Sequence, residues 1–175
     1  MATLLYIHGF NSSPQSHKAA ATRAWLAAQH PEIAFRCPFL SPFPDQAMDQ
    51  LQREIAALTG PLYLAGSSMG GFYATWLAVR HGARAVLINP AVRPWLGRDY
   101  LLGPQANHYT GEVVVMEPRH LEQLRAWEVE TLPRPQDFLV LLQTGDEVLD
   151  YRLAAEKYHA CRLVIEPGGD HGFQD

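Results

Sequence analysis

The sequence predicts an α/β protein in which a mainly parallel central sheet lies between two layers of helices. Short apolar runs alternate with longer segments of helical character, the order that produces strand, crossover helix and strand. The runs 62–65, 85–89 and 138–143 are apolar without alternation, as in strands that helices cover on both faces. With 175 residues, the chain has the size of one domain, residues 1–175. We therefore expect a single three-layer sandwich.

The expected elements follow from apolar periodicity and from turn residues. Strands are expected at 3–7, 33–37, 62–65, 85–89, 138–143 and 162–165. Helices are expected near 16–29, 48–58, 69–81, 118–129 and 151–159. In the second helix, Met48, Leu51, Ile55 and Leu58 recur at spacings of three and four, which places them on one face. Asp45, directly after Pro44, is a candidate cap for this helix.

The stretch 91–135 interrupts the alternation because it is long for one crossover and rich in proline and aromatic residues. It leaves the carboxyl end of the strand 85–89. Ligands of open α/β sheets bind at the carboxyl ends of the strands. We therefore expect a small cap or lid at about 91–135.

Composition and charge exclude several classes of protein. The formal net charge is -4, and the basic residues are scattered singly, which disfavours nucleic acid as a partner. The first residues lack a signal peptide, and no apolar run is long enough for a membrane span, so we expect a cytoplasmic protein. Cys37 and Cys161 are expected to be buried thiols, with a disulfide left open as the less favoured interpretation.

The strongest motif is Gly66-Ser67-Ser68-Met69-Gly70, a G-x-S-x-G pattern between the strand 62–65 and a helix. Glycines two positions before and after the serine permit a turn so sharp that Ser68 is held out from the sheet. The N-terminus of the following helix favours an oxyanion near the Met69 N–H. Ser68 is thus a candidate nucleophile.

A serine nucleophile needs a histidine base, and His171 is the best candidate. It lies in the glycine-rich turn 168–172, just after the last predicted strand. The other histidines lie near predicted helices or in the insertion, where solvated or capping roles are expected: His17, His30, His81, His108, His120 and His159. His8 lies in the loop after the first predicted strand.

The carboxylate that orients this base should follow a strand that lies between serine and histidine in the sequence. Asp146 follows the strand 138–143 and a glycine turn. Glu147 and Asp150 are rivals, but Asp150 directly precedes a helix and is a natural N-cap. Asp170 is too close to His171 in the sequence to reach the far side of its imidazole easily. Asp146 is therefore our choice.

A second oxyanion donor is expected in the loop that follows the first strand. His8-Gly9-Phe10 begins this loop, and the glycine allows the Phe10 N–H to point at the site. We favour a structural role for His8, which would hold the loop by hydrogen bonds, over a role in proton transfer.

The motifs, their order along the chain and the short sequence segments around them resemble those of α/β-hydrolases, and more narrowly those of small bacterial esterases of the YqiA/YcfP type. The matching sequence segments are residues 4–14, 66–75, 89–94, 143–152 and 168–171. The resemblance implies Ser68 as nucleophile, Asp146 as acid and His171 as base, in ester or thioester hydrolysis. A mechanism with these three residues needs no metal or organic cofactor. Such proteins usually continue into a last helix, whereas only four residues follow His171, so we expect this end to fray.

The expected function is that of a serine esterase acting on carboxylic esters with short to medium acyl chains, or on thioesters. Acyl-coenzyme A hydrolysis as the main activity and a non-catalytic binding module are the alternatives. The partner is a small-molecule acyl substrate, and the sequence leaves the oligomeric state open. Apolar residues of the insertion would cover an acyl chain or pack the lid: Trp95, Leu96, Tyr100, Leu101 and Leu102. Arg93, Arg98 and Arg119 would meet the phosphates of coenzyme A or lie solvated on the surface.

Overall fold

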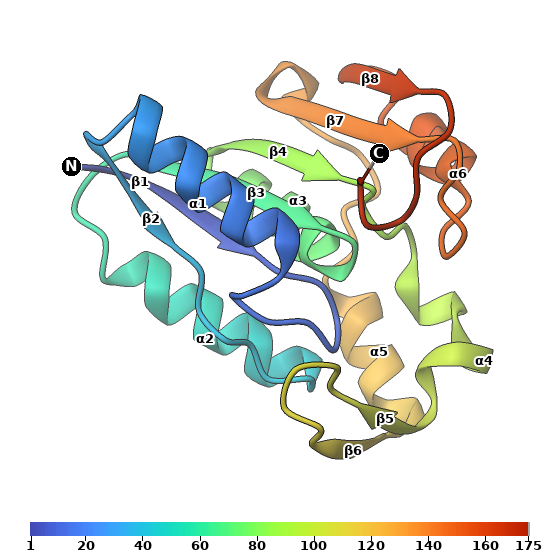
Figure 1. Ribbon diagram of the computed structural model, residues 1–175. Coiled ribbons are helices and arrows are strands. Elements are labelled where there is room, and N and C mark those ends of the chain that lie inside the picture. The colour runs from blue at the N-terminus through green and yellow to red at the C-terminus, as the bar shows by residue number, and fades with distance from the viewer. Residues whose placement is uncertain (175) are drawn as a thin grey trace.

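Six parallel strands form the central sheet of the computed structural model, which describes residues 1–174 (Figure 1). Their order across the sheet is β2-β1-β3-β4-β7-β8. The strands are β1 (Ala2–Ile7), β2 (Ile33–Arg36), β3 (Leu62–Ser67), β4 (Arg84–Ile88), β7 (Phe138–Gln143) and β8 (Arg162–Glu166). The predicted fold class is confirmed, and every predicted strand is found within two residues of its expected bounds. Asp175, which the expected domain includes, lies outside the described residues.

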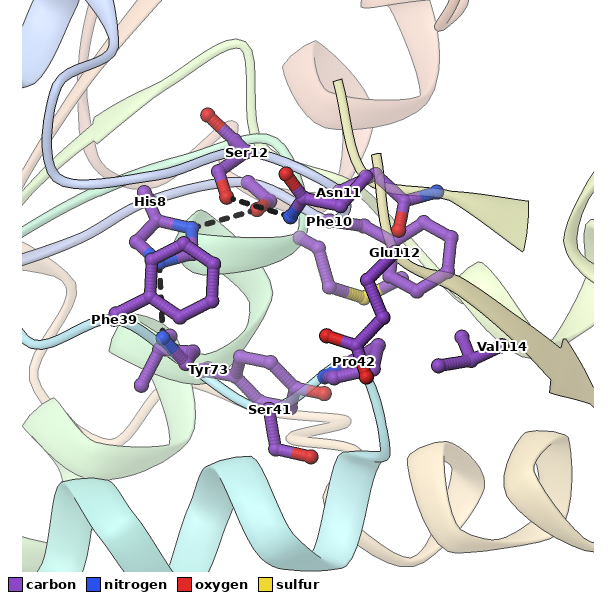
Figure 2. Close-up of a pocket in the computed structure, with 14 residues that line it drawn as sticks. His8, Phe10, Asn11, Ser12, Phe39, Ser41, Pro42, Tyr73, Glu112 and Val114 are labelled. Atoms are coloured by element: carbon purple, nitrogen blue, oxygen red, sulfur yellow. Dashed lines mark hydrogen bonds between the residues drawn. The ribbon is translucent and has the colours of Figure 1, made fainter. Parts of the chain in front are cut away.

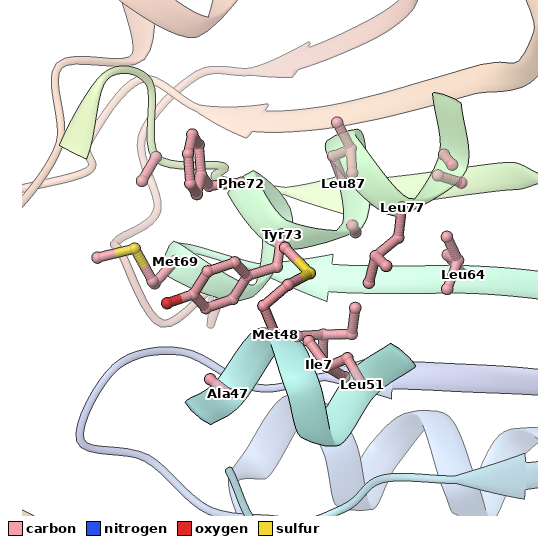
Figure 3. Packing of buried hydrophobic residues seen from close by; sticks show 14 of the residues in the cluster. Ile7, Ala47, Met48, Leu51, Leu64, Met69, Phe72, Tyr73, Leu77 and Leu87 are labelled. Atoms are coloured by element: carbon pink, nitrogen blue, oxygen red, sulfur yellow. The ribbon is translucent and has the colours of Figure 1, made fainter. Parts of the chain in front are cut away.

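Helices cover the two faces of the sheet unequally. They are α1 (His17–Gln29), α2 (Pro44–Ala56), α3 (Met69–His81), α4 (Arg98–Leu101), α5 (Pro118–Ala126) and α6 (Tyr151–Lys157). The main core lies on the face covered by α2 and α3, where Met48, Leu51 and Leu77 pack against Ile7 and Leu64 (Figure 3). The opposite face carries α1 and a small cluster of buried residues (Figure 1). Within residues 1–174, no helix is long and apolar enough to cross a membrane.

Helix α2 follows the predicted periodicity but begins earlier than expected. Met48, Leu51 and Ile55 are all buried, as their spacing predicts. The placement of Leu58 on this helix is wrong, because the helix ends at Ala56. The helix starts at Pro44, a favourable first position because proline needs no hydrogen-bond partner for its nitrogen there. The expectation that Asp45 caps this helix is wrong, since Phe43 occupies the cap position and Asp45 lies within the first turn. The Asp45 carboxylate is still well placed, because the helix dipole favours negative charge there.

The stretch 91–135 builds a small subdomain beside the carboxyl ends of the strands (Figure 1). It contains the short 3-10 turn η1 (Pro94–Leu96), α4, an antiparallel hairpin of β5 (Gly103–Ala106) and β6 (Val113–Met116), and α5. A second 3-10 turn, η2 (Pro135–Asp137), leads into β7. Helix α5 packs against α2, which joins this stretch to the main core.

The two cysteines differ from expectation in their burial. Cys37 and Cys161 are free thiols, so the less favoured disulfide is not formed. Both are half-buried, and the expectation of full burial is therefore wrong. The reason is that Cys37 lies just past the end of β2 and Cys161 lies just before β8, and these are the two edge strands of the sheet.

Candidate active site

Ser68 lies on a sharp turn between β3 and α3, as the motif predicts. Its backbone has φ 55° and ψ −122°, a conformation that costs energy for any residue other than glycine. A Cβ atom at Gly66 would collide with the carbonyl oxygen of Gly70, and one at Gly70 would collide with that of Ile7. The Ser68 N–H donates to the Ile88 carbonyl oxygen at 3.1 Å. These contacts hold the strained turn in place.

The structure brings the side chains of Ser68, His171 and Asp146 into one hydrogen-bonded row. His171 Nε2 lies 3.1 Å from Ser68 Oγ, although the two residues are 103 positions apart in the chain. His171 Nδ1 lies 2.8 Å from Asp146 Oδ2. A carboxylate only accepts hydrogen bonds, so Nδ1 carries the proton and Nε2 is left to accept from the serine hydroxyl. This is the arrangement that activates a serine as a nucleophile.

Asp146 is held as a charged carboxylate. Its side chain is 1% exposed, and burial by itself would raise the pKa of this carboxyl. The hydrogen bond from His171 and those from the backbone N–H groups of Leu149 and Val148 outweigh burial, so the pKa lies below its usual value. The two backbone bonds reach Oδ1, at 2.9 Å from Val148 and 2.8 Å from Leu149. Asp146 therefore stays ionised while it faces His171.

The rival carboxylates have other partners. Asp150 caps α6, because its Oδ1 accepts from the Arg152 N–H at 3.0 Å, as predicted. Asp170 Oδ1 accepts from the Gln174 N–H at 3.0 Å. Glu147 Oε2 accepts from the His171 N–H at 2.9 Å, so it supports the backbone of this residue and not its ring. Of the four carboxylates considered, Asp146 is the one bonded to the imidazole.

Two polar residues that the motif analysis did not single out hold the loop that carries His171. Asn89 is 3% exposed, and its Nδ2 donates to the carbonyl oxygens of Asp170 at 3.1 Å and His171 at 3.4 Å. Lys18 Nζ donates to the carbonyl oxygens of His171 at 3.2 Å and Gly172 at 2.8 Å. The loop that we expected to fray is thus bonded to α1 and to the end of β4. The sequence signal that could have identified Asn89 is its position as a polar residue directly after the apolar strand β4.

We expect Asn89→Gly to lower the free energy of unfolding by about 1–3 kcal/mol, because it leaves a buried N–H donor without an acceptor. Asn89 Oδ1 accepts from the buried Gln143 N–H at 3.0 Å, and this group loses its acceptor. Glycine is chosen because the φ of 41° at Asn89 would strain alanine. Urea denaturation measures the change, and Gln29→Ala, at an exposed position in the last turn of α1, serves as the control. Equal stability of Asn89→Gly and the unmodified protein would contradict the assigned role.

Two backbone N–H groups border Ser68 at the position expected for an oxyanion hole. Within residues 1–174, the N–H groups of Phe10 and Met69 donate to no protein acceptor. A Cβ atom built on Gly9 would lie 3.5 Å from Ser68 Cβ, so the loop after β1 passes directly beside the serine. Free N–H groups beside a nucleophile are what stabilises the oxyanion of acyl transfer.

His8 holds this loop from below. Its ring is buried, with Nδ1 2.8 Å from the Gly9 carbonyl oxygen and Nε2 accepting from the Leu40 N–H at 3.1 Å (Figure 2). Burial lowers the pKa of this imidazole, which keeps the ring neutral. Because both ring nitrogens are already bonded, the contacts match the structural role that we favoured over proton transfer.

The arginines of the insertion are partly engaged by carboxylates. Arg93 pairs with Glu128 at 3.2 Å, and Arg119 pairs with Glu117 at 2.9 Å. These pairs favour the interpretation of Arg93 and Arg119 as surface residues. The apolar residues of the insertion differ in their burial. Leu101 is buried in the core, whereas Leu96 and Tyr100 are exposed.

The sheet order, the serine turn after β3 and the histidine loop after β8 define an α/β-hydrolase fold. Est1E from Butyrivibrio proteoclasticus shares this fold with a TM-score of 0.75 and 16% sequence identity, covering 99% of this chain and 81% of that one. Alpha/beta hydrolase domain-containing protein 10 from mouse gives a TM-score of 0.74 at 15% identity, covering 97% and 81%. The esterase domain of a Rhodothermus marinus protein gives 0.70 at 22%, covering 99% and 80%.

Within this class, the chain belongs to the family described as "Uncharacterised protein family (UPF0227)", which matches residues 3–175. A UPF0227 protein of Serratia proteamaculans (strain 568) is 27% identical over 181 residues, covering 98% of this chain and 91% of the relative. The resemblance stated from the motifs is thereby confirmed.

Proposed function

We propose that the protein is a serine esterase that hydrolyses carboxylic esters of short to medium acyl length, or thioesters. The observation that carries the proposal is the hydrogen-bonded row from Ser68 Oγ through His171 to the ionised Asp146. The names of two structural neighbours, Est1E and the Rhodothermus marinus esterase domain, agree with such an activity.

In the proposed reaction, Ser68 Oγ attacks the carbonyl carbon of the ester while His171 Nε2 takes the hydroxyl proton. The N–H groups of Phe10 and Met69 donate to the oxyanion of the tetrahedral intermediate, each worth about a hundredfold to a thousandfold in rate. The carbon–oxygen or carbon–sulfur bond then breaks, and the leaving group takes the proton from His171. Water, deprotonated by His171, attacks the acyl-serine and releases the acid.

Hydrolysis and active-site labelling together test this proposal. We expect the protein to hydrolyse p-nitrophenyl esters or acyl-coenzyme A thioesters of graded acyl length, and to react once with a fluorophosphonate. Peptide mass spectrometry should locate the label on Ser68. Failure both to turn over any substrate and to take the label would instead favour the alternative, a non-catalytic binding module on the same fold.

A further inference from the structure

The turn after β7 and the loop after β8 are bonded to each other along their backbones. They carry Asp146 and His171, and the two strands that lead to them are neighbours in the sheet (Figure 1). The Gly145 N–H donates to the Gly168 carbonyl oxygen at 2.8 Å. A Cβ atom at Gly145 would collide with the carbonyl oxygen of Gly169. The two segments therefore reach the site as one bonded unit.

One buried side chain, that of Gln143, joins the same two segments. This residue is 3% exposed and stands at the last position of β7. Its Oε1 accepts from the Asp170 N–H at 3.0 Å, and its Nε2 donates to Glu166 Oε2 at 3.2 Å. Its backbone carbonyl oxygen accepts from the Asp146 N–H at 3.3 Å. Gln143 thus contacts Asp146 through its backbone and the residue before His171 through its side chain.

The direction of the Gln143 amide is fixed by its partners. A carboxylate only accepts hydrogen bonds, so the NH₂ end of the amide faces Glu166. The carbonyl end is left to accept from the Asp170 N–H. Gly169 lets the loop approach this amide, because its φ of 71° suits glycine and a Cβ atom there would collide with Gln143 Oε1. Glu166 therefore orients the amide, and the amide holds the residue that precedes His171.

The bonds from Gln143 differ from those of Asn89 and Lys18 in the element that provides them. Asn89 follows β4 and Lys18 lies on α1, and both donate to carbonyl oxygens of the histidine loop. Gln143 ends β7, the strand that leads directly to Asp146. Through Gln143, the position of His171 is therefore coupled to that of Asp146.

We propose that Gln143 is a positioning residue for the base: its amide, oriented by Glu166, holds His171 within hydrogen-bonding distance of Asp146 and Ser68. A displacement of the histidine loop by about 1 Å would weaken both bonds, and a misplacement of that size costs about a hundredfold in rate. Because Gln143 is buried, its amide does not meet the substrate. The inference rests on the proposed function and adds to it a side chain that places the base.

The test replaces the amide and then restores its bonds from the other side. Gln143→Glu keeps the size of the side chain but sets a second carboxylate against that of Glu166. We expect kcat to fall by about tenfold to a hundredfold, with KM within about threefold of that of the unmodified protein. Adding Glu166→Gln supplies an NH₂ group to the new carboxylate, so the double variant should recover most of the lost kcat. Gln143→Met, which removes both side-chain bonds without adding charge, should lower kcat as well.

A spectroscopic measurement reports on the base directly. The proton shared by His171 Nδ1 and Asp146 gives a downfield proton NMR signal, which is identified by its loss in Asp146→Asn. This signal should weaken in Gln143→Glu and return in the double variant. The matched controls are the exposed residues Gln29, on α1, and Glu122, on α5, and both Gln29→Glu and Glu122→Gln should keep kcat and the signal. Thermal unfolding of each variant checks that it is folded.

Folded Gln143→Glu and Gln143→Met proteins with unchanged kcat would overturn the inference and leave the esterase proposal standing. A loss of kcat in Gln143→Glu that Glu166→Gln does not recover would overturn it as well. Should no ester be hydrolysed and no label be taken, the esterase proposal fails, and the NMR signal still tests the positioning role. Loss of the signal in Gln143→Glu with recovery in the double variant would support this role, and an unchanged signal would reject it.

Discussion

Ser68→Ala is expected to lower kcat on an activated ester by about 10⁴- to 10⁶-fold, the loss found when a serine nucleophile is removed from such a set of residues. The hydroxyl is the group proposed to attack, and within residues 1–174 the Ser68 side chain forms a hydrogen bond to His171 alone. The substitution leaves the strained backbone as it is, because alanine and serine have the same cost at φ 55°. The fold and the free energy of unfolding should therefore change little.

Initial-rate assays on the best substrate of the graded series measure this effect, with circular dichroism as the check on folding. Ser67→Ala is the matched control, since Ser67 is the preceding residue, is buried at the end of β3, and takes no part in the hydrogen bonds that join Ser68, His171 and Asp146. Turnover that stays within tenfold of the unmodified protein in Ser68→Ala would reject the assignment of the nucleophile. Equal losses in both variants would mean that the turn, and not the hydroxyl, is responsible.

Asp146→Asn is expected to lower kcat by about 10⁴-fold, through the wrong tautomer of His171. Asp146 Oδ1 accepts from two backbone N–H groups, so the oxygen of an amide at this position stays on that side. The amide NH₂ group then faces His171 Nδ1, which must become an acceptor. The ring proton moves to Nε2, and that nitrogen can no longer accept the proton of the Ser68 hydroxyl.

The control for this substitution is Asp150→Asn, which changes the cap of α6 and leaves His171 untouched. We expect Asp150→Asn to keep its activity and to lose at most about 1 kcal/mol of stability. The pair is measured by steady-state kinetics and by urea denaturation. Comparable activities of Asp146→Asn and Asp150→Asn would show that Asp146 does not orient the base.

The layers and the serine turn were predictable because they depend on local signals. Apolar runs of strand length and the spacing of Met48, Leu51 and Ile55 in α2 follow from which faces are buried. The G-x-S-x-G turn depends on steric contacts between neighbours, and Gly66 and Gly70 meet the backbone where the motif requires it. The cap of α2 was less predictable, since Phe43 and Asp45 are both compatible with a helix that begins at Pro44.

By itself, the sequence determined the α/β class, the order of the strands along the chain and the residue types able to carry hydrolytic chemistry. The tertiary structure decided which carboxylate meets His171 and how Asn89 and Lys18 hold the histidine loop. The physical reason is range. Turns and periodic faces arise from interactions over a few residues, whereas these contacts join segments that meet only after the parallel strands have brought their carboxyl ends to one edge.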